Sequence, residues 1–229
     1  MIKVLFICHG NICRSPMAEF VFKDMVCRAG IAGDFEIASA ATSREELGNP
    51  VYPPARRKMA EHGIDCTGKR ARRITDADYD HYDMLIGMDE ENIYNMRRFF
   101  HGDEEKKIYT LLHFAGRDDE VADPWYTGDF EATWQDVNEG CLGLLNYLRP
   151  EVTLDFSSCR ERAELFSLMR EKMLWGEEYG ENLDALHDVL TGMPHYGRSF
   201  RIILPDESAP CRVYAEKVLW LFDELELTI

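Results

Sequence analysis

The sequence is poor in basic residues: 26 Lys and Arg stand against 42 Asp and Glu, a formal net charge of −16. A surface this acidic repels nucleic acid, so we expect no nucleic-acid partner. The chain also lacks any apolar run of the roughly 18 residues that a membrane span requires. The apolar stretch after Lys3 is too short for a signal peptide. We therefore expect a cytoplasmic protein without membrane contact.

Paired cysteine motifs are absent as well. The chain has seven cysteines, an odd number, and none of them form a CxxC pair. This argues against a disulfide framework and against a structural zinc site. Internal repeats and low-complexity stretches are also lacking, so the chain is expected to fold into ordinary globular domains.

Strand-like and helix-like segments alternate through the first two thirds of the sequence. Short apolar segments predict strands at 4–7, 35–40, 84–88 and 107–112, and helical periodicity predicts helices at 16–29, 54–62 and 130–148. This alternation indicates an α/β fold, a parallel sheet with helices on both faces. Ligands of such sheets bind where the strands end and the loops lead into helices.

The pattern restarts after Pro150. It predicts strands at 152–156, 200–204 and 227–229, and helices at 160–174, 180–192 and 214–225. We therefore predict two domains, 1–149 and 151–229, of which the second is a small α/β domain.

The stretch CHGNICRSP, residues 8–16, follows the first predicted strand. Ser15 suits the N-cap and Pro16 the first helical position of the helix that follows. Helix N-termini, loop amides and a nearby arginine all favour a reactive thiolate and a bound phosphate. We interpret the segment as a phosphate-binding loop with Cys8 as nucleophile and Arg14 as bidentate anchor. The alternative is a buried cysteine beside a surface arginine.

A thiolate that attacks phosphorus needs an acid to protonate the leaving oxygen. Asp123, in Asp123-Pro124-Trp125-Tyr126, follows the fourth predicted strand and a loop, at the same sheet edge as Cys8. Pro124 stiffens the backbone beside it. The alternative is an Asp-Pro turn before a helix.

Three motifs of the first domain resemble the low-molecular-weight protein tyrosine phosphatases: CHGNICRSP, SAATS at 39–43 and DPWYTGDFEATWQDVNEGC at 123–141. The resemblance implies a phosphocysteine intermediate on Cys8, charge stabilisation by Arg14, and proton donation by Asp123 to the tyrosinate of a phosphotyrosine protein. It implies no cofactor and no metal. The substrate-binding residues that it implies are His9, Gly10, Asn11, Ile12, Cys13, Ser15, Trp125 and Tyr126, and Ser39 has a supporting role.

Several positions bear on substrate preference and on redox behaviour. His9 stands where the family often has an aliphatic residue, and Lys69 falls near a loop-bracing histidine. Glu45 and Glu46 lie in the loop that tunes specificity, where they disfavour acidic flanks around the phosphotyrosine. Cys13 either forms a protective disulfide with Cys8 or is only a packed small residue. Arsenate reduction in the same fold requires two further cysteines, and none lies between Cys66 and Cys141.

The run EYGENLDALHDVLTG, residues 178–192, resembles the second helix of barstar, the ribonuclease inhibitor. In barstar this helix presents carboxylates to a basic nuclease, and Asp184 and Asp188 match two of them at i, i+4. Glu178, His187 and Met193 replace aromatic residues, so the fold carries over better than nuclease inhibition. A basic protein such as a ribonuclease is the implied partner, and a solvated acidic face is the alternative.

Two function classes follow from the sequence. The first is a tyrosine phosphatase with an accessory protein-binding domain. The second is an inhibitor or immunity-type binding protein with a vestigial phosphatase half. The complete set of Cys8, Arg14 and Asp123 favours the first.

Overall fold

The computed structural model describes residues 1–148, 151–173, 180, 182–192 and 199–225. The chain divides into two compact units, Met1–Leu145 and Asn146–Ile229. The predicted boundary at Pro150 lies outside the described residues.

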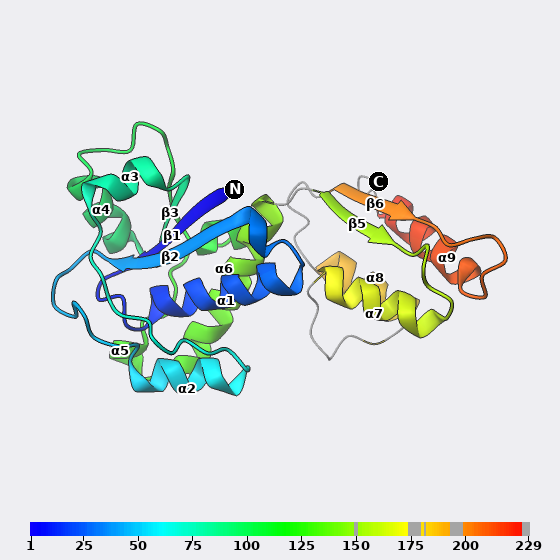
Figure 1. The fold of residues 1–229 in the computed structure, drawn as a ribbon, viewed down its shortest axis with the longest axis horizontal. Helices are drawn as coiled ribbons and strands as arrows, with labels where there is room; N and C mark the ends of the chain where they lie inside the picture. The colour runs from blue at the N-terminus through cyan, green and yellow to red at the C-terminus, as the bar shows by residue number, and fades with distance from the viewer. Residues whose placement is uncertain (149–150, 174–179, 181, 193–198, 226–229) are drawn as a thin grey trace. The chain divides into compact units, whose positions relative to one another are not determined.

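The first unit is built on a four-stranded parallel sheet (Figure 1). Its strands are β1 (Ile2–Cys8), β2 (Phe35–Ala41), β3 (Met84–Gly87) and β4 (Ile108–Thr110), in the order β2-β1-β3-β4. Leu5 pairs with Ala38 on one side and with Leu85 on the other, so β1 is central. The last residue of this central strand is Cys8, which therefore lies at the carboxyl edge of the sheet.

Helices cover both faces of this sheet, as the sequence predicts. The helices of the unit are α1 (Arg14–Arg28), α2 (Pro53–Glu61), α3 (Asp76–His81), α4 (Glu90–Phe99), α5 (Pro124–Thr127) and α6 (Phe130–Leu148). Figure 1 shows α1 and α6 on one face, and α3 and α4 on the other. Phe22 of α1 packs edge-on against Phe6, whereas Ile93 and Met96 of α4 join the cluster around Leu5.

The long helix α6 packs closely on the segment that follows β4, residues Leu112–Ala115 in a 3₁₀ turn. A Cβ atom added at Gly143 would lie 2.2 Å from the carbonyl oxygen of Phe114. Only glycine permits this approach of the backbone. The Cys141 thiol donates to the carbonyl of Ala18, which ties α6 to α1 as well.

The start of α1 differs from the prediction. The helix begins at Arg14, its N-cap residue is Cys13, and no side chain caps it. Ser15 is therefore not the N-cap, and Pro16 is not the first helical residue. The hydroxyl of Ser15 contacts the Cys8 sulfur instead of a helix amide. β4 is also shorter than predicted, because residues from Leu112 onward form the 3₁₀ turn.

The described part of the second unit contains two parallel strands, β5 (Glu151–Asp155) and β6 (Ser199–Ile203). The helices within this described part are α7 (Arg162–Met173), α8 (Leu183–Gly192) and α9 (Arg212–Glu224). Its apolar core includes Leu154, Phe166, Leu186, Phe200 and Phe222. The predicted strand at 227–229 lies outside the described residues.

Among the helices of the described ranges, none is long and apolar enough to cross a membrane.

Candidate active site

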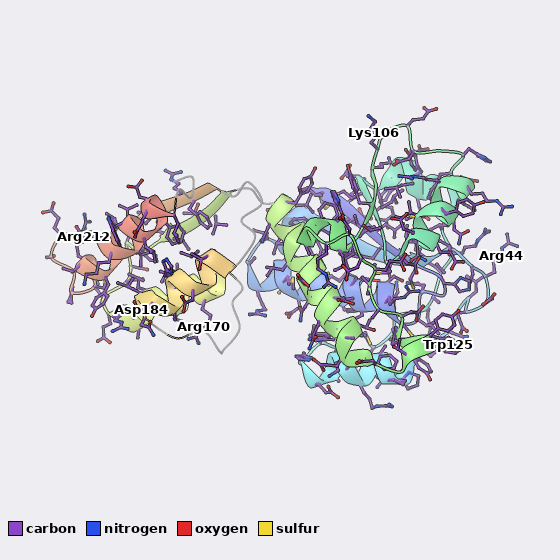
Figure 2. The ribbon with its side chains drawn as sticks, turned by 180° about the vertical axis from the view of Figure 1, so that it is seen from behind. Arg44, Lys106, Trp125, Arg170, Asp184 and Arg212 are labelled. Atoms are coloured by element: carbon purple, nitrogen blue, oxygen red, sulfur yellow. The ribbon has the colours of Figure 1, made fainter. Side chains whose placement is uncertain are left out.

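A pocket of about 590 Å³ lies at the carboxyl edge of the first unit's sheet. Its lining brings together segments that are far apart in the sequence: the loop after β1, the loop after β2, the start of α4 and the segment that leads into α5. Cys8 and Arg14 are part of this lining, and so is Asp123. Figure 2 labels Trp125 of α5 and Arg44 of the loop after β2, two residues at the end of the unit where the pocket lies.

Neighbouring segments hydrogen-bond to the backbone carbonyls of the loop between Cys8 and Arg14. Thr42 and Ser43 donate their N–H groups to the carbonyls of Cys8 and His9, and Tyr52 donates to that of Ile12. In a trans peptide the next N–H points opposite to the carbonyl. The N–H groups of the residues after Cys8, His9 and Ile12 therefore point away from these outer segments, toward the pocket. A ring of such amides at a helix N-terminus is suited to bind a phosphate-like anion.

Two positions in this loop favour their residue type. Asn11 has a φ of 57°, in the left-handed region that asparagine tolerates better than most residues. A Cβ added at Gly10 would lie 3.1 Å from Cγ of Glu46, so a larger residue would require the Glu46 side chain to shift by a few tenths of an ångström.

The Cys8 sulfur lies 3.0 Å from Ser15 Oγ and accepts the N–H of Asn11 at 3.2 Å. Only 3% of Cys8 is exposed. The neighbouring Cys13 is also buried, and burial, aided by the charge of Cys8, raises its pKa to about 12. The Cys13 thiol is thus held protonated at neutral pH.

Arg14 joins two carboxylates. Its Nη1 lies 2.6 Å from Asp89 Oδ2, and its Nη2 lies 2.6 Å from Asp123 Oδ2. Burial opposes the charge on Arg14, but Cys8, Asp123 and Asp89 outweigh it and raise its pKa. The guanidinium is therefore permanently charged, and the two carboxylates fix its orientation in the pocket that Cys8 also lines.

Asp123 and Asp89 are both helix N-caps. Asp123 Oδ1 accepts the N–H of Trp125 at the start of α5, and Asp89 Oδ1 accepts that of Asn92 in α4. Each carboxylate thus uses one oxygen to cap a helix and the other to bind Arg14. The Asp-Pro turn before a helix, which the sequence offers as an alternative to a catalytic role, is compatible with that role.

The predicted substrate-binding residues fall into two groups. His9, Gly10, Ile12, Cys13, Trp125 and Tyr126 line the pocket. Asn11 and Ser15 are fully buried and lie outside this lining, as does Ser39, and all three belong to a polar network beneath the loop. Trp125 is 60% exposed and Tyr126 is 86% exposed, so both stand at the pocket mouth.

Sequence reasoning misses three other features of the pocket and its surroundings. It does not identify Asp89 as a partner of Arg14, 75 residues away. It does not place Glu91 and Glu120 in the pocket wall. It also overlooks Glu19, a buried acid that accepts a hydrogen bond from Ser39. The signal for Glu19 was its position four residues after Ser15, on a buried helix face.

Family comparison decides what kind of site this is. The family model described as low molecular weight phosphotyrosine protein phosphatase matches residues 3–154. The chain belongs to the low molecular weight protein tyrosine phosphatases. It is thus a phosphoric monoester hydrolase, and the resemblance of the sequence motifs is confirmed.

Individual relatives support the same family assignment. This phosphatase is 38% identical over 156 residues to the phosphatase YfkJ of Bacillus subtilis, and the match covers 67% of this chain and 100% of YfkJ. The crystal structure of YfkJ matches this structure with a TM-score of 0.63, over 65% of this chain and 94% of the YfkJ chain. The human phosphatase is 36% identical over 150 residues, or 62% of this chain and 93% of the human one. A Drosophila arginine phosphatase is 27% identical, covering 64% of this chain and 98% of its own with a TM-score of 0.60.

A second family model, described as barstar (barnase inhibitor), matches residues 149–226 of the phosphatase. The predicted barstar-like domain is thus indicated by comparison as well as by the quoted run. In the described part of that run, Asp184, His187 and Asp188 are exposed on α8, opposite buried Leu186 and Leu190. Figure 2 labels Asp184 on this helix. Glu178 and Met193 lie outside the described residues.

Proposed function

We propose that this protein hydrolyses phosphotyrosine in proteins through a phosphocysteine intermediate on Cys8. The observation that carries the proposal is the convergence of Cys8, Arg14 and Asp123 in one pocket at the sheet edge. The thiolate attacks phosphorus, the tyrosine oxygen leaves with a proton from Asp123, and water then cleaves the S–P bond. Asp123 removes a proton from that water in the second step, so one group serves both steps.

Charge stabilisation in both steps falls to Arg14 and the loop amides. The planar guanidinium donates two parallel hydrogen bonds to equatorial phosphoryl oxygens, a geometry that an ammonium cannot reproduce. The amides are fixed before substrate binds, because outer segments hold their carbonyls. Preorganised donors of this kind stabilise the transition state without further reorganisation.

The walls of the pocket support an aromatic substrate. Ile12 and the exposed ring of Trp125 line it, and Tyr52 lies behind Trp125 with ring centroids 5.5 Å apart. A phenyl ring can pack between such groups. The arginine phosphatase among the structural relatives makes phosphoarginine the competing substrate class.

An assay on a phosphotyrosine peptide and a phosphoarginine peptide of the same sequence separates the two classes. We expect turnover of the phosphotyrosine peptide by the wild type and none by Cys8→Ser. Selective turnover of the phosphoarginine peptide would contradict the assigned substrate. Equal turnover by the wild type and Cys8→Ser would contradict the assignment of Cys8 as nucleophile.

We further propose that the second unit binds a basic protein through α8. Exposed Asp184 and Asp188 share one face of this helix with His187, and the match to barstar supports the assignment. Carboxylates on a rigid helix steer toward a basic cleft, and salt screens this attraction. Because His187 stands at an aromatic position of barstar, we expect weak inhibition of a generic ribonuclease at most.

The test is a titration of the full chain with a basic microbial ribonuclease at two salt concentrations. We expect weak binding that Asp184→Ala/Asp188→Ala and added salt both reduce. Binding that neither change affects would mean that the acidic face is only solvated.

A further inference from the structure

The residue that precedes Asp123 is held through both of its backbone groups. Ala122 donates its N–H to Asp136 Oδ2 at 2.9 Å, and its carbonyl accepts the hydroxyl of Thr133 at 2.8 Å. Thr133 and Asp136 belong to α6 and stand at i, i+3, so they share one face of that helix. Because peptide groups are planar, these two bonds fix the peptide planes on both sides of Ala122 against α6.

The second of these peptide groups joins Ala122 to Asp123. On the other side of Asp123, the ring of Pro124 fixes its own φ and restricts the residue before it to extended conformations. Asp123 is extended, with a φ of −86° and a ψ of 107°. The backbone from which the Asp123 carboxyl group projects is thus set by α6 on one side and by the proline on the other.

Asp136 is itself held in place by an arginine of the segment that leads to Ala122. Its Oδ1 lies 2.9 Å from Arg117 Nη1, and its side chain is 13% exposed. Arg117 also pairs with Asp119 and with Glu139, and its hydrogen bonds to these two carboxylates raise its pKa further. Asp136 therefore uses one oxygen for Arg117 and the other for Ala122, and it cannot turn without losing one of them.

Thr133 completes the grip on Ala122 from a fully buried position. A threonine hydroxyl within a helix commonly bonds the carbonyl four residues earlier. That carbonyl, of Asp129, lies 3.2 Å from Thr133 Oγ1, farther away than the carbonyl of Ala122. The hydroxyl thus favours the segment that carries Asp123 over its own helix.

We propose that Asp136 is a positioning residue for proton transfer: together with Thr133 it holds Ala122 and so places the Asp123 carboxyl group at the leaving oxygen. The inference rests on the proposed function, in which Asp123 protonates that oxygen. Asp136 lies outside the pocket lining, whereas Asp123 is part of it. Asp136 therefore acts on the reaction only through the backbone of Ala122.

A positioning role and a purely structural role lead to different kinetics. Proton transfer depends steeply on geometry, and a displacement of about 1 Å can cost about 10²-fold in rate. A displaced Asp123 slows only the departure of a leaving group that needs a proton. General damage to the pocket slows every substrate alike.

The test is the rate of leaving-group release in the first turnover, measured by rapid quench with a phosphotyrosine peptide and with p-nitrophenyl phosphate. Asp136→Ala is compared with Glu139→Ala, which removes another carboxylate from the same nitrogen of Arg117. We expect Asp136→Ala to slow the peptide about tenfold and p-nitrophenyl phosphate less than about twofold. Glu139→Ala should match the wild type on both substrates. Equal losses on the two substrates, or no loss, in folded Asp136→Ala would overturn the proposal.

Asp136→Ala leaves the N–H of Ala122 without its acceptor, which can weaken the fold. Thr133→Val provides a second test, because it removes only the hydroxyl and keeps a side chain of similar size. We expect the same selective loss on the phosphotyrosine peptide, and its recovery in Thr133→Ser, which retains the hydroxyl. A folded Thr133→Val enzyme without this selective loss would also overturn the proposal.

The double variant Asp123→Asn/Asp136→Ala shows whether the two residues act as one unit. We expect it to release the peptide no more slowly than Asp123→Asn alone, because the acid that Asp136 positions is already absent. A further tenfold loss would mean that Asp136 acts by another route. Equal slowing of both substrates in Asp123→Asn would overturn the proposed acid and this inference with it. A selective loss in Asp123→Asn beside an unaffected Asp136→Ala would overturn the inference alone.

Discussion

Arg14 and Asp123 form a direct ion pair, with Nη2 and Oδ2 2.6 Å apart. A phosphoryl group bound in the loop competes with Asp123 for this same nitrogen. We expect the guanidinium to turn to the phosphoryl oxygens when substrate binds, which frees the Asp123 carboxyl group to reach the leaving oxygen.

Replacing Asp123 by Asn separates substrates by their leaving group. We expect turnover of a phosphotyrosine peptide to fall by about 10²-fold or more, because tyrosinate leaves poorly without a proton. In the first step, the loss on p-nitrophenyl phosphate should be less than about tenfold, since nitrophenolate leaves unprotonated. The rate of leaving-group release in the first turnover measures this on both substrates, and equal losses would remove Asp123 from the acid role.

The contact between Arg14 and Asp89 predicts a graded effect on catalysis. Arg14→Lys keeps the charge but loses the fork, so kcat should fall by about 10²-fold or more. Asp89→Asn retains a good N-cap for α4 and weakens only the ion pair with Arg14. For this variant we expect kcat to fall by about tenfold, with little change in Tm. A fully active Arg14→Lys enzyme would contradict the bidentate role.

Much of this arrangement could be predicted from the sequence. The strands and long helices were predictable because apolar periodicity reflects burial directly, and α6 spans the same residues as its prediction. The thiolate loop was predictable because its residues are contiguous. The start of α1 was not, because the Ser15 hydroxyl contacts Cys8 rather than capping the helix.

The contacts missed in the sequence join distant segments. Glu19 and Lys69 meet only after the segment following α2 folds back beside β2, where Ala41 bridges to Arg73. The second role of Asp89 likewise depends on the neighbouring positions of β1 and β3. No local spacing encodes either contact.

The pocket rim predicts a preference among substrates. Four acidic side chains line its mouth from opposite sides, Glu45, Glu46, Glu91 and Glu120. We expect phosphotyrosine peptides with Lys or Arg flanks to have a higher kcat/KM than peptides with acidic flanks, by about two- to fivefold for each added charge, and less at high salt.

Matched variants locate this preference. Glu46→Gln/Glu91→Gln should reduce it, whereas Asp34→Asn, at the opposite edge of the sheet, should leave it unchanged. If the preference for basic flanks persists in the double variant, groups other than Glu46 and Glu91 cause it.

Cys13 provides a redox prediction. We expect peroxide to oxidise Cys8 to a sulfenic acid, and the Cys13 thiol then to displace water and form a disulfide. Activity lost to peroxide should therefore return with a dithiol in the wild type and much less in Cys13→Ala. Peptide mass spectrometry should detect the Cys8–Cys13 disulfide. Irreversible loss in both proteins would leave Cys13 a packing residue.

The central claim is that the phosphoryl group passes to Cys8, and a rapid-quench experiment on Asp123→Asn tests it most directly. With p-nitrophenyl phosphate this variant forms the intermediate without an acid but activates water poorly, so the intermediate accumulates. We predict a burst of nitrophenolate equal to the enzyme concentration, with one phosphoryl group on the peptide that contains Cys8. A phosphoryl group on another residue, or turnover with no phosphorylated enzyme, would contradict the account.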